Sequence, residues 1–221
     1  MYQIIDTIFS SPLKQNLAFK WGTLCYFLHN LPRFSTDLDF DLINDTGNIM
    51  ESIPSILKPL GNIKDSKNKR FTYFFLFNYW SWQHNIKIEI SKKKYINNTY
   101  ENINFFGRDI TAMAKDSIFT NKLLALSNRY KNRDLFDVHF FFTNKYPINE
   151  QLIKERTWLS YKDFLLMIKK EIPVRYNKKN ILAEIGDLIS DKQKQFMKTQ
   201  LIPETLSFID FALFNIEHPI K

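Results

Sequence analysis

A strict alternation of acidic and apolar residues, Asp-Leu-Asp-Phe-Asp-Leu at residues 37–42, is the feature that most constrains the fold. Successive side chains of a β-strand point to opposite faces of its sheet, so the alternation predicts a strand with one apolar face and one carboxylate face. Asp37 and Asp39 would then lie roughly 7 Å apart. Such a face is stable if water covers it or a cation binds there, so a solvated edge strand and a divalent-metal site both fit the pattern.

The residues before this strand favour the metal site. Gly22 and Thr23 form a small-residue turn that opens a short apolar segment, residues 24–31, and this segment reads as a helix ended by Pro32. A strand that follows such a turn and helix is more typical of a metal-binding site than of a solvated edge strand.

A second strand with an acid on its polar face is predicted at residues 85–91, Asn-Ile-Lys-Ile-Glu-Ile-Ser. Its isoleucines form a core face, which leaves Glu89 on the opposite face. If this strand lies close to the first one with the same pleat, Glu89 stands beside Asp37 and Asp39 and completes a carboxylate triad. The alternative is a surface glutamate between two isoleucines.

The pattern becomes helical from Met113 onward. Lys122 and Arg129 are seven residues apart and share one helix face. Asp134 and Asp137 are three apart and also share a face. Because apolar residues lie between these two acids, a buried ion pair, a functional cluster and an ordinary surface salt bridge all remain open.

Together these patterns predict an α/β chain with a mixed sheet and flanking helices over residues 1–147, and a helical C-terminal part over residues 148–221. A strand interior to the sheet is expected at residues 71–79, because both of its faces are largely apolar. The other expectations are helices at 2–9, from Pro12, at 49–57, 150–156, 160–171, 176–189, 191–199 and 203–217, a loop at 64–69, and turns at 44–47 and 81–83.

Composition narrows the class of partner. The net charge of +8 favours a polyanion such as RNA or DNA, and the lysines gather in runs. The single cysteine, Cys25, excludes an internal disulfide and is expected in the core, and the four histidines lack the spacing of zinc ligands. The N-terminal residues lack the pattern of a signal peptide, and no apolar run is long enough for a membrane span, so a cytoplasmic location is expected.

Five motifs in a fixed order closely resemble the AbiEii/AbiGii-type toxin family of nucleotidyltransferases. They are Lys20-Trp-Gly-Thr, Arg33-Phe-Ser-Thr-Asp-Leu-Asp-Phe, Ile88-Glu-Ile, Lys122-Leu-Leu-Ala-Leu-x-x-Arg129 and Arg133-Asp-Leu-Phe-Asp137. The family is similar in outline to the DNA polymerase β-like superfamily and includes MenT-type toxins, which attach nucleotides to the 3′ end of tRNA. The resemblance covers residues 18–142.

The resemblance implies a nucleotidyltransferase-type sheet, a nucleoside triphosphate as substrate, Mg²⁺ as cofactor, tRNA or another RNA as acceptor, and a cognate antitoxin as partner. It implies that Asp37, Asp39 and Glu89 hold the metal and that Lys122 neutralises triphosphate charge, as Mg²⁺ and cations do in phosphoryl-type transfer. The implied catalytic residues are Asp37, Asp39, Lys122, Asp134 and Asp137. The implied nucleotide-binding residues are Lys20, Gly22, Thr23, Ser35 and Arg129.

Two residues depart from the family pattern. The family usually has Gly-Gly-Thr where this chain has Trp21 before Gly22, and glycine at that place suits a positive φ or a close approach of phosphate. Glu89 stands where aspartate is common, which moves the carboxylate by about one methylene. Two other functions therefore remain: a small-molecule (antibiotic) nucleotidyltransferase, which the positive charge disfavours for a cationic drug, and a catalytically silent RNA-binding protein of the same fold.

Overall fold

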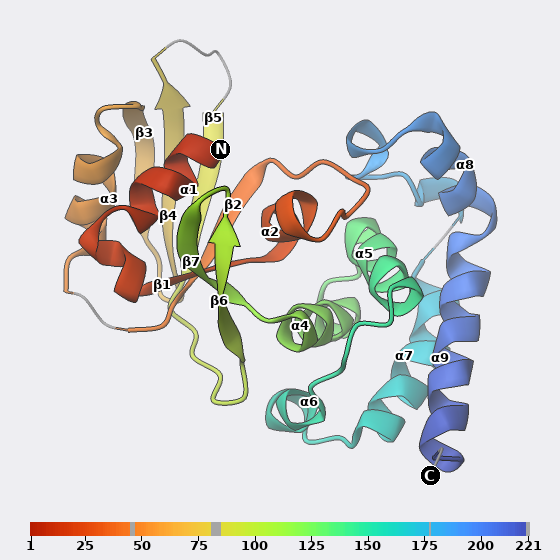
Figure 1. Cartoon of the computed structure of the whole chain (residues 1–221). Coiled ribbons are helices and arrows are strands. Elements are labelled where there is room, and N and C mark those ends of the chain that lie inside the picture. Colours follow the sequence, from red (N-terminus) through yellow and green to blue (C-terminus); the bar gives the residue numbers. More distant parts are fainter. Residues whose placement is uncertain (45–46, 81–84, 177, 220–221) are drawn as a thin grey trace. The chain divides into compact units, whose positions relative to one another are not determined.

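The computed structural model describes residues 1–44, 47–80, 85–176 and 178–219 (Figure 1). The turns expected at 44–47 and 81–83 fall wholly or partly outside these ranges. The chain forms two compact units. Unit 1 comprises residues 1–30 and 34–114, and unit 2 comprises residues 31–33 and 115–221.

Unit 1 is built on a seven-stranded mixed sheet in the order β3-β4-β5-β2-β1-β7-β6. The strands are β1 (Leu17–Lys20), β2 (Asp37–Leu42), β3 (Gly61–Asn68), β4 (Thr72–Tyr79), β5 (Asn85–Ser91), β6 (Tyr100–Phe105) and β7 (Arg108–Met113). β2 pairs with β5 and β1 pairs with β7 in parallel, and the other neighbours are antiparallel. The acid-bearing strand β2 therefore lies in the middle of the sheet and is not an edge strand.

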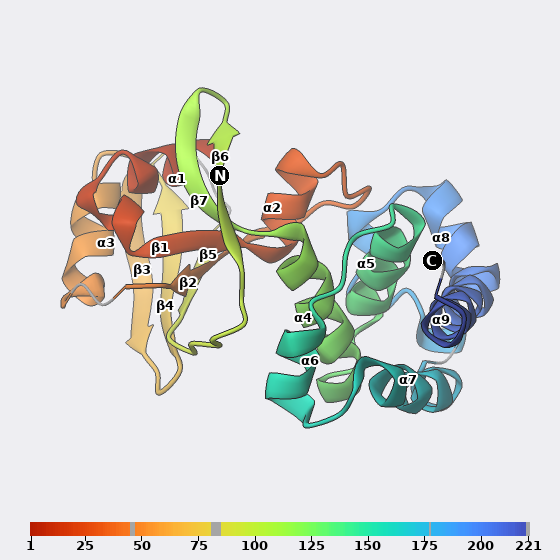
Figure 2. The same cartoon turned by 60° about the horizontal axis from the view of Figure 1, so that its bottom comes forward.

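Two helices, α1 (Tyr2–Phe9) and α3 (Ile49–Leu57), lie side by side across one face of the sheet (Figures 1 and 2). Leu38 and Phe40 of β2 are fully buried on that face, and the ring of Phe40 lies 6.2 Å from the ring of Phe9 in α1. The carboxylates of β2 consequently point to the opposite face. The predicted division of this strand into an apolar and an acidic face is confirmed.

A short helix, α2 (Trp21–Leu28), follows β1 directly, and a 3₁₀ turn at Pro12–Gln15 precedes β1. Ser11 caps this turn, because its side chain accepts a hydrogen bond from the backbone N–H of Leu13. The predicted cap and proline start are present, but the expected second helix from Pro12 is only this single turn.

Unit 2 is helical and is organised around α4 (Lys115–Asn128), in which every residue from Ser117 to Leu126 is buried. A helix that is buried on all sides forms the centre of a bundle. The other helices are α5 (Asn132–Thr143), α6 (Glu150–Thr157), α7 (Tyr161–Arg175), α8 (Asp191–Thr199) and α9 (Leu201–Glu217). α5 packs between α4 and α9, and α7 packs against α9.

The predicted α/β class is confirmed, with two local corrections. The loop expected at 64–69 is wrong, because residues 64–68 belong to edge strand β3, whose Lys, Asp and Asn side chains are the kind that natural edge strands carry. The helix expected at 176–189 is also wrong, because the described residues of this segment, 176 and 178–189, form 3₁₀ turns at Lys178–Asn180 and Gly186–Leu188 and no α-helix. Strands β1, β6 and β7 had not been predicted.

The strand expected at 71–79 is interior, as predicted, since β4 pairs with β3 and β5. The predicted division into a catalytic domain over 1–147 and a helical domain over 148–221 is a division by function. The two compact units do not test it, so it stays a prediction. Among the described residues, no helix combines the length and the apolar character needed to cross a membrane.

Gly61 at the start of β3 should be essential to the packing of unit 1. A Cβ at this position would collide with the carbonyl oxygen of Asn78 and would come within 2.6 Å of the Phe77 ring. We expect Gly61→Ala to lower the free energy of unfolding by about 1–3 kcal/mol in urea denaturation. Gly186→Ala is the matched control, because its Cβ would meet only Leu182 at 3.7 Å, an ordinary contact. Equal stability of the two variants would contradict this expectation.

Candidate active site

The acids of β2 and β5 meet across a parallel strand pair. Asp39 lies opposite Glu89 in the register, and Asp37 lies opposite Lys87. Residues that are register partners point to the same face of the sheet, so Asp37, Asp39 and Glu89 share the face opposite α1. The prediction that these two strands adjoin with the same pleat is confirmed, and a lysine stands within the acidic group.

These carboxylates are half-buried, and Asp37 interacts with the Lys87 ammonium at 3.5 Å. Carboxylate oxygens that remain partly open to water are the donors that Mg²⁺ prefers in proteins. Within the described ranges, no three His, Cys, Asp or Glu side chains converge as a ready-made metal site. The donor set therefore fits Mg²⁺ in its chemistry, and the side chains would have to turn toward the ion.

The third acid of β2, Asp41, has a different environment. It is buried, its Oδ1 lies 2.6 Å from the Lys20 ammonium, and the Tyr100 hydroxyl donates to its Oδ2 at 3.0 Å. Burial and the adjacent Asp41 charge raise the pKa of Tyr100 well above its usual range, so this hydroxyl stays a donor. In this structure Lys20, which the sequence assigned to nucleotide binding, neutralises Asp41.

Helix α2 delivers the small residues Gly22 and Thr23 to its first turn, and both are buried. The Thr23 hydroxyl hydrogen-bonds to the backbone carbonyl of Asp37 and to the Ser35 hydroxyl, the latter at 2.9 Å. Thr23 and Ser35 thus tie the start of α2 to the start of β2. Backbone N–H groups in the first turn of a helix favour anions, so this end of α2 suits a phosphate group.

Trp21 begins α2 with a φ of +68°, in the left-handed region that favours glycine. For a residue with a Cβ, this conformation raises the free energy of the folded state by about 1–3 kcal/mol. The Lys20 ammonium lies 5.2 Å from the centroid of the Trp21 ring, a cation–π contact. The backbone at this position therefore has the geometry expected of a glycine, although the side chain is the largest available.

The late motifs form a buried ionic cluster inside unit 2. Lys122 of α4 lies 3.0 Å from Asp134 and 2.7 Å from Asp137, both on α5. Arg129 pairs with Asp134 at 2.7 Å. The Arg33 guanidinium donates two hydrogen bonds of 2.6 Å to the carboxylate of Asp137. Both aspartates are fully buried. Of the three interpretations left open by the sequence, the surface salt bridge is excluded and a buried ion network is found.

The cations determine the protonation of this cluster. Burial alone would raise the pKa of each aspartate, but Lys122 and Arg129 hold the pKa of Asp134 well below its usual range. Arg33 and Lys122 likewise lower the pKa of Asp137. Lys122 and Arg33 are buried beside these carboxylates, whereas the Arg129 side chain is 32% exposed.

Arg33 had not been identified as a site residue. It lies 104 residues before Asp137, so spacing along the sequence could not reveal the pair. The only available signal was its place in the motif that leads into Asp37. Lys87 and Tyr100 were missed for a similar reason, since each meets its aspartate only through the pairing of the sheet.

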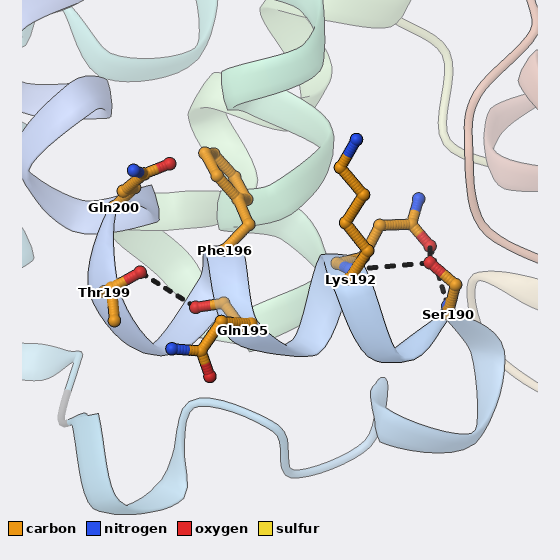
Figure 3. Close-up of a pocket in the computed structure, with 7 residues that line it drawn as sticks. Ser190, Lys192, Gln195, Phe196, Thr199 and Gln200 are labelled. Atoms are coloured by element: carbon orange, nitrogen blue, oxygen red, sulfur yellow. Dashed lines mark hydrogen bonds between the residues drawn. The ribbon is translucent and has the colours of Figure 1, made fainter.

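A separate open hollow lies along α8 in unit 2 (Figure 3). It is lined by Ser190, Lys192, Gln193, Gln195, Phe196, Thr199 and Gln200. The Thr199 hydroxyl is already bonded to the Gln195 carbonyl, and Ser190 forms a capping box with Gln193. None of the sequence-predicted site residues lines this hollow, so it is not the candidate active site.

A family model described as nucleotidyl transferase AbiEii toxin, type IV toxin–antitoxin system, matches residues 3–213. The chain belongs to the AbiEii family. Membership makes it a toxin-type nucleotidyltransferase, with a nucleoside triphosphate as substrate and an antitoxin as partner. The resemblance drawn from the five motifs is confirmed over nearly the whole chain.

Two crystal structures from Helicobacter pylori share the fold of this AbiEii chain. JHP933 is 20% identical with a TM-score of 0.59, and the match covers 98% of this chain and 93% of that one. A candidate nucleotidyltransferase is 19% identical with a TM-score of 0.60, over 98% and 96% of the two chains. The search of curated proteins gave no significant match.

The left-handed backbone at Trp21 can be tested with two variants that both remove the indole. Trp21→Gly relieves the strain of the positive φ, whereas Trp21→Ala retains it, so we expect the glycine variant to be more stable by about 1 kcal/mol. Urea unfolding of the two proteins under identical conditions measures the difference. An alanine variant as stable as the glycine variant would show that this position is unstrained.

The ionic cluster should make unit 2 sensitive to acid. A lowered carboxyl pKa contributes stability that is complete above the unfolded value of about 3.9 and is lost as the pH falls through the folded value. Asp137→Asn should therefore cost about 3–5 kcal/mol at pH 7, because it leaves Arg33 and Lys122 buried with less compensation, and should flatten the decline of stability below pH 4.

The matched control for Asp137→Asn is Asp210→Asn on α9. Asp210 forms an exposed ion pair with Lys169, and such pairs contribute about 1 kcal/mol or less. Urea titrations of the three proteins between pH 3 and pH 7 supply the comparison. If the two substitutions cost the same, the buried cluster does not stabilise unit 2.

Proposed function

We propose that this AbiEii-family chain is a Mg²⁺-dependent enzyme that transfers a nucleotide from a nucleoside triphosphate to the 3′ end of a tRNA and so blocks translation. The observation that carries the proposal is the pairing of β2 with β5, which sets Asp37, Asp39 and Glu89 on one sheet face. The net charge of +8 supports a polyanionic acceptor over a cationic antibiotic.

In the proposed reaction, the 3′ hydroxyl oxygen of the RNA attacks the α-phosphorus of the triphosphate. A new phosphorus–oxygen bond forms, the bond to the bridging oxygen breaks, and pyrophosphate leaves with its electron pair. The hydroxyl proton passes to a carboxylate of the triad or to water. Catalysis of such transfers consists mainly of positioning and charge neutralisation, so the protein needs no covalent intermediate.

Each side chain of unit 1 has a distinct proposed role. Asp37, Asp39 and Glu89 would hold the metal, and bound Mg²⁺ supplies phosphate charge neutralisation and a lower pKa for the attacking hydroxyl. Lys87, which already contacts Asp37, would move toward phosphate oxygen when the carboxylate turns to a metal. The first turn of α2 would receive phosphate at its backbone N–H groups.

The roles of the unit 2 residues come from the family resemblance. Lys122 would neutralise triphosphate charge, and Arg129 would assist it. The cluster supports these roles because it holds the two cations together, Lys122 at 3.0 Å and Arg129 at 2.7 Å from the Asp134 carboxylate. Asp134 and Asp137 would keep both cations charged and fixed in place, which makes the two aspartates positioning residues for this step.

The test is incorporation of labelled nucleotide into total tRNA, with each of the four nucleoside triphosphates in turn. We expect one of them to label the 3′ end, and we expect EDTA to abolish labelling and added Mg²⁺ to restore it. Asp39→Asn should reduce incorporation to background, because the amide cannot replace a carboxylate ligand. Circular dichroism should show that the variant remains folded.

Asp109→Asn on β7 is the matched control, since Asp109 is an exposed acid of the same unit, whose Oδ1 accepts a hydrogen bond from Asn104. It should retain full incorporation. Undiminished transfer by Asp39→Asn would remove this residue from the metal site. RNA binding without incorporation of any nucleotide would favour the catalytically silent RNA-binding protein, for which Trp21 at the family's glycine position is the structural argument.

A further inference from the structure

The tip of the β3–β4 hairpin, together with the residues after β5, forms a surface in which cations and aromatic rings alternate. We define this hairpin-tip surface as residues 67–74 and 92–94, all in unit 1 at the end of the sheet where β3 turns into β4 and β5 ends (Figure 2). Its cationic side chains are Lys67, Lys69, Arg70, Lys92, Lys93 and Lys94. Neither the family resemblance nor the carboxylate site accounts for it.

Each aromatic ring of this surface has a cation over its face. Phe71 has Arg70 at 4.8 Å and Lys93 at 5.0 Å from its ring centroid, and its side chain is 47% exposed. Lys69 lies 4.8 Å from the Phe74 ring, and Lys92 lies 4.1 Å from the Tyr73 ring. The cations are thus held beside flat apolar faces that water reaches.

Backbone and side-chain hydrogen bonds fix the shape of the tip. The Lys92 backbone N–H donates to the Phe71 carbonyl at 2.9 Å, and its ammonium donates to the Lys69 carbonyl at 2.6 Å and to the Asn68 side chain. The Lys69 backbone N–H donates to the Thr72 carbonyl at 2.9 Å. Lys92, the residue after β5, therefore holds the hairpin tip in place, so a ligand would meet a prearranged surface.

Phe74 connects this surface with the candidate active site along one row of the sheet, whereas Tyr73, the register partner of Ile90, lies on the opposite face with Lys92 over its ring. Phe74 is the register partner of Glu89, and Glu89 is the register partner of Asp39, so the three side chains share one face. Two strand spacings separate Phe74 from Asp39, which is about 10 Å. A single-stranded nucleic acid bound at the tip could therefore extend toward the carboxylates.

We propose that the hairpin-tip surface binds the unpaired 3′ segment of the acceptor RNA, with bases stacked on Phe71 and Phe74 and phosphates on the neighbouring lysines. Aromatic faces beside cations are the combination that binds single-stranded nucleic acid. A duplex would offer its phosphates to the cations but could not present base faces to the rings. This inference rests on the proposed function, because it names the place where that reaction's acceptor would dock.

The test measures binding of a labelled RNA stem–loop with a single-stranded 3′ tail, and of the same stem with a blunt end, by fluorescence anisotropy without nucleoside triphosphate. Phe71→Ala should weaken binding of the tailed RNA by about tenfold and leave the blunt RNA unchanged. Phe71→Tyr keeps an aromatic face and should bind like the wild type. Because Phe71 is exposed, these substitutions leave the core intact.

The electrostatic part is tested with Lys69→Gln/Lys93→Gln. Each phosphate contact on a single strand contributes about 0.7 to the slope of log affinity against log salt, so this variant should lower the slope by about 1.4. Lys14→Gln/Lys58→Gln removes the same charge from exposed positions of unit 1 outside the hairpin-tip surface and is the matched control. Its slope should stay that of the wild type.

The outcomes separate this inference from the proposed function. If the wild type incorporates nucleotide but Phe71→Ala changes neither tailed-RNA affinity nor the KM for RNA, the hairpin-tip surface is not the docking place and the proposed function stands. If the wild type incorporates nothing but the hairpin variants lose tailed-RNA binding as expected, the surface stands and the proposed function fails. Equal weakening of tailed and blunt RNA by Phe71→Ala would overturn the stacking role.

Discussion

The pairing of a triply acidic strand with its neighbours, in the middle of a sheet, is the constraint on which this structure depends. β2 must bury Leu38 and Phe40 under α1, and the strict period of two then forces its acids onto the other face. Lysines of the adjoining strands β1 and β5 contact the acids at the two ends of that row. At the centre Asp39 lies directly opposite Glu89, and like charges at opposed positions destabilise a sheet.

That opposition fits the proposed Mg²⁺ site, since a site that binds a cation needs negative charge already in place. Burial of aromatic residues of β2, β4 and α1 in the surrounding core offsets the free energy of this charge repulsion. The same sheet face carries the ring of Phe74 one strand beyond Glu89. The register of β2, β5 and β4 therefore places the acids and Phe74 of the hairpin-tip surface in one row.

The sequence could predict the strands and helices whose apolar residues recur at a regular spacing. The alternation at 37–42 and 85–91 predicts strands and the spacing of Lys122 with Arg129 predicts a helix, and the structure contains all three elements. Edge strand β3 was missed because its side chains are polar on both faces, which resembles a loop. Pairings such as Arg33 with Asp137 and Tyr100 with Asp41 could not be predicted, because they depend on long-range topology and not on spacing.

The clustering of residues 31–33 with the helical unit makes that unit discontinuous in sequence. Arg33 supplies two of the hydrogen bonds that satisfy the buried carboxylate of Asp137. A recombinant fragment that starts at Lys115 would contain all of α4 to α9 and still lack this guanidinium. In that fragment Asp137 would keep its contact with Lys122 but lose the guanidinium, so we expect the fragment to be less stable than the same helices in the whole chain.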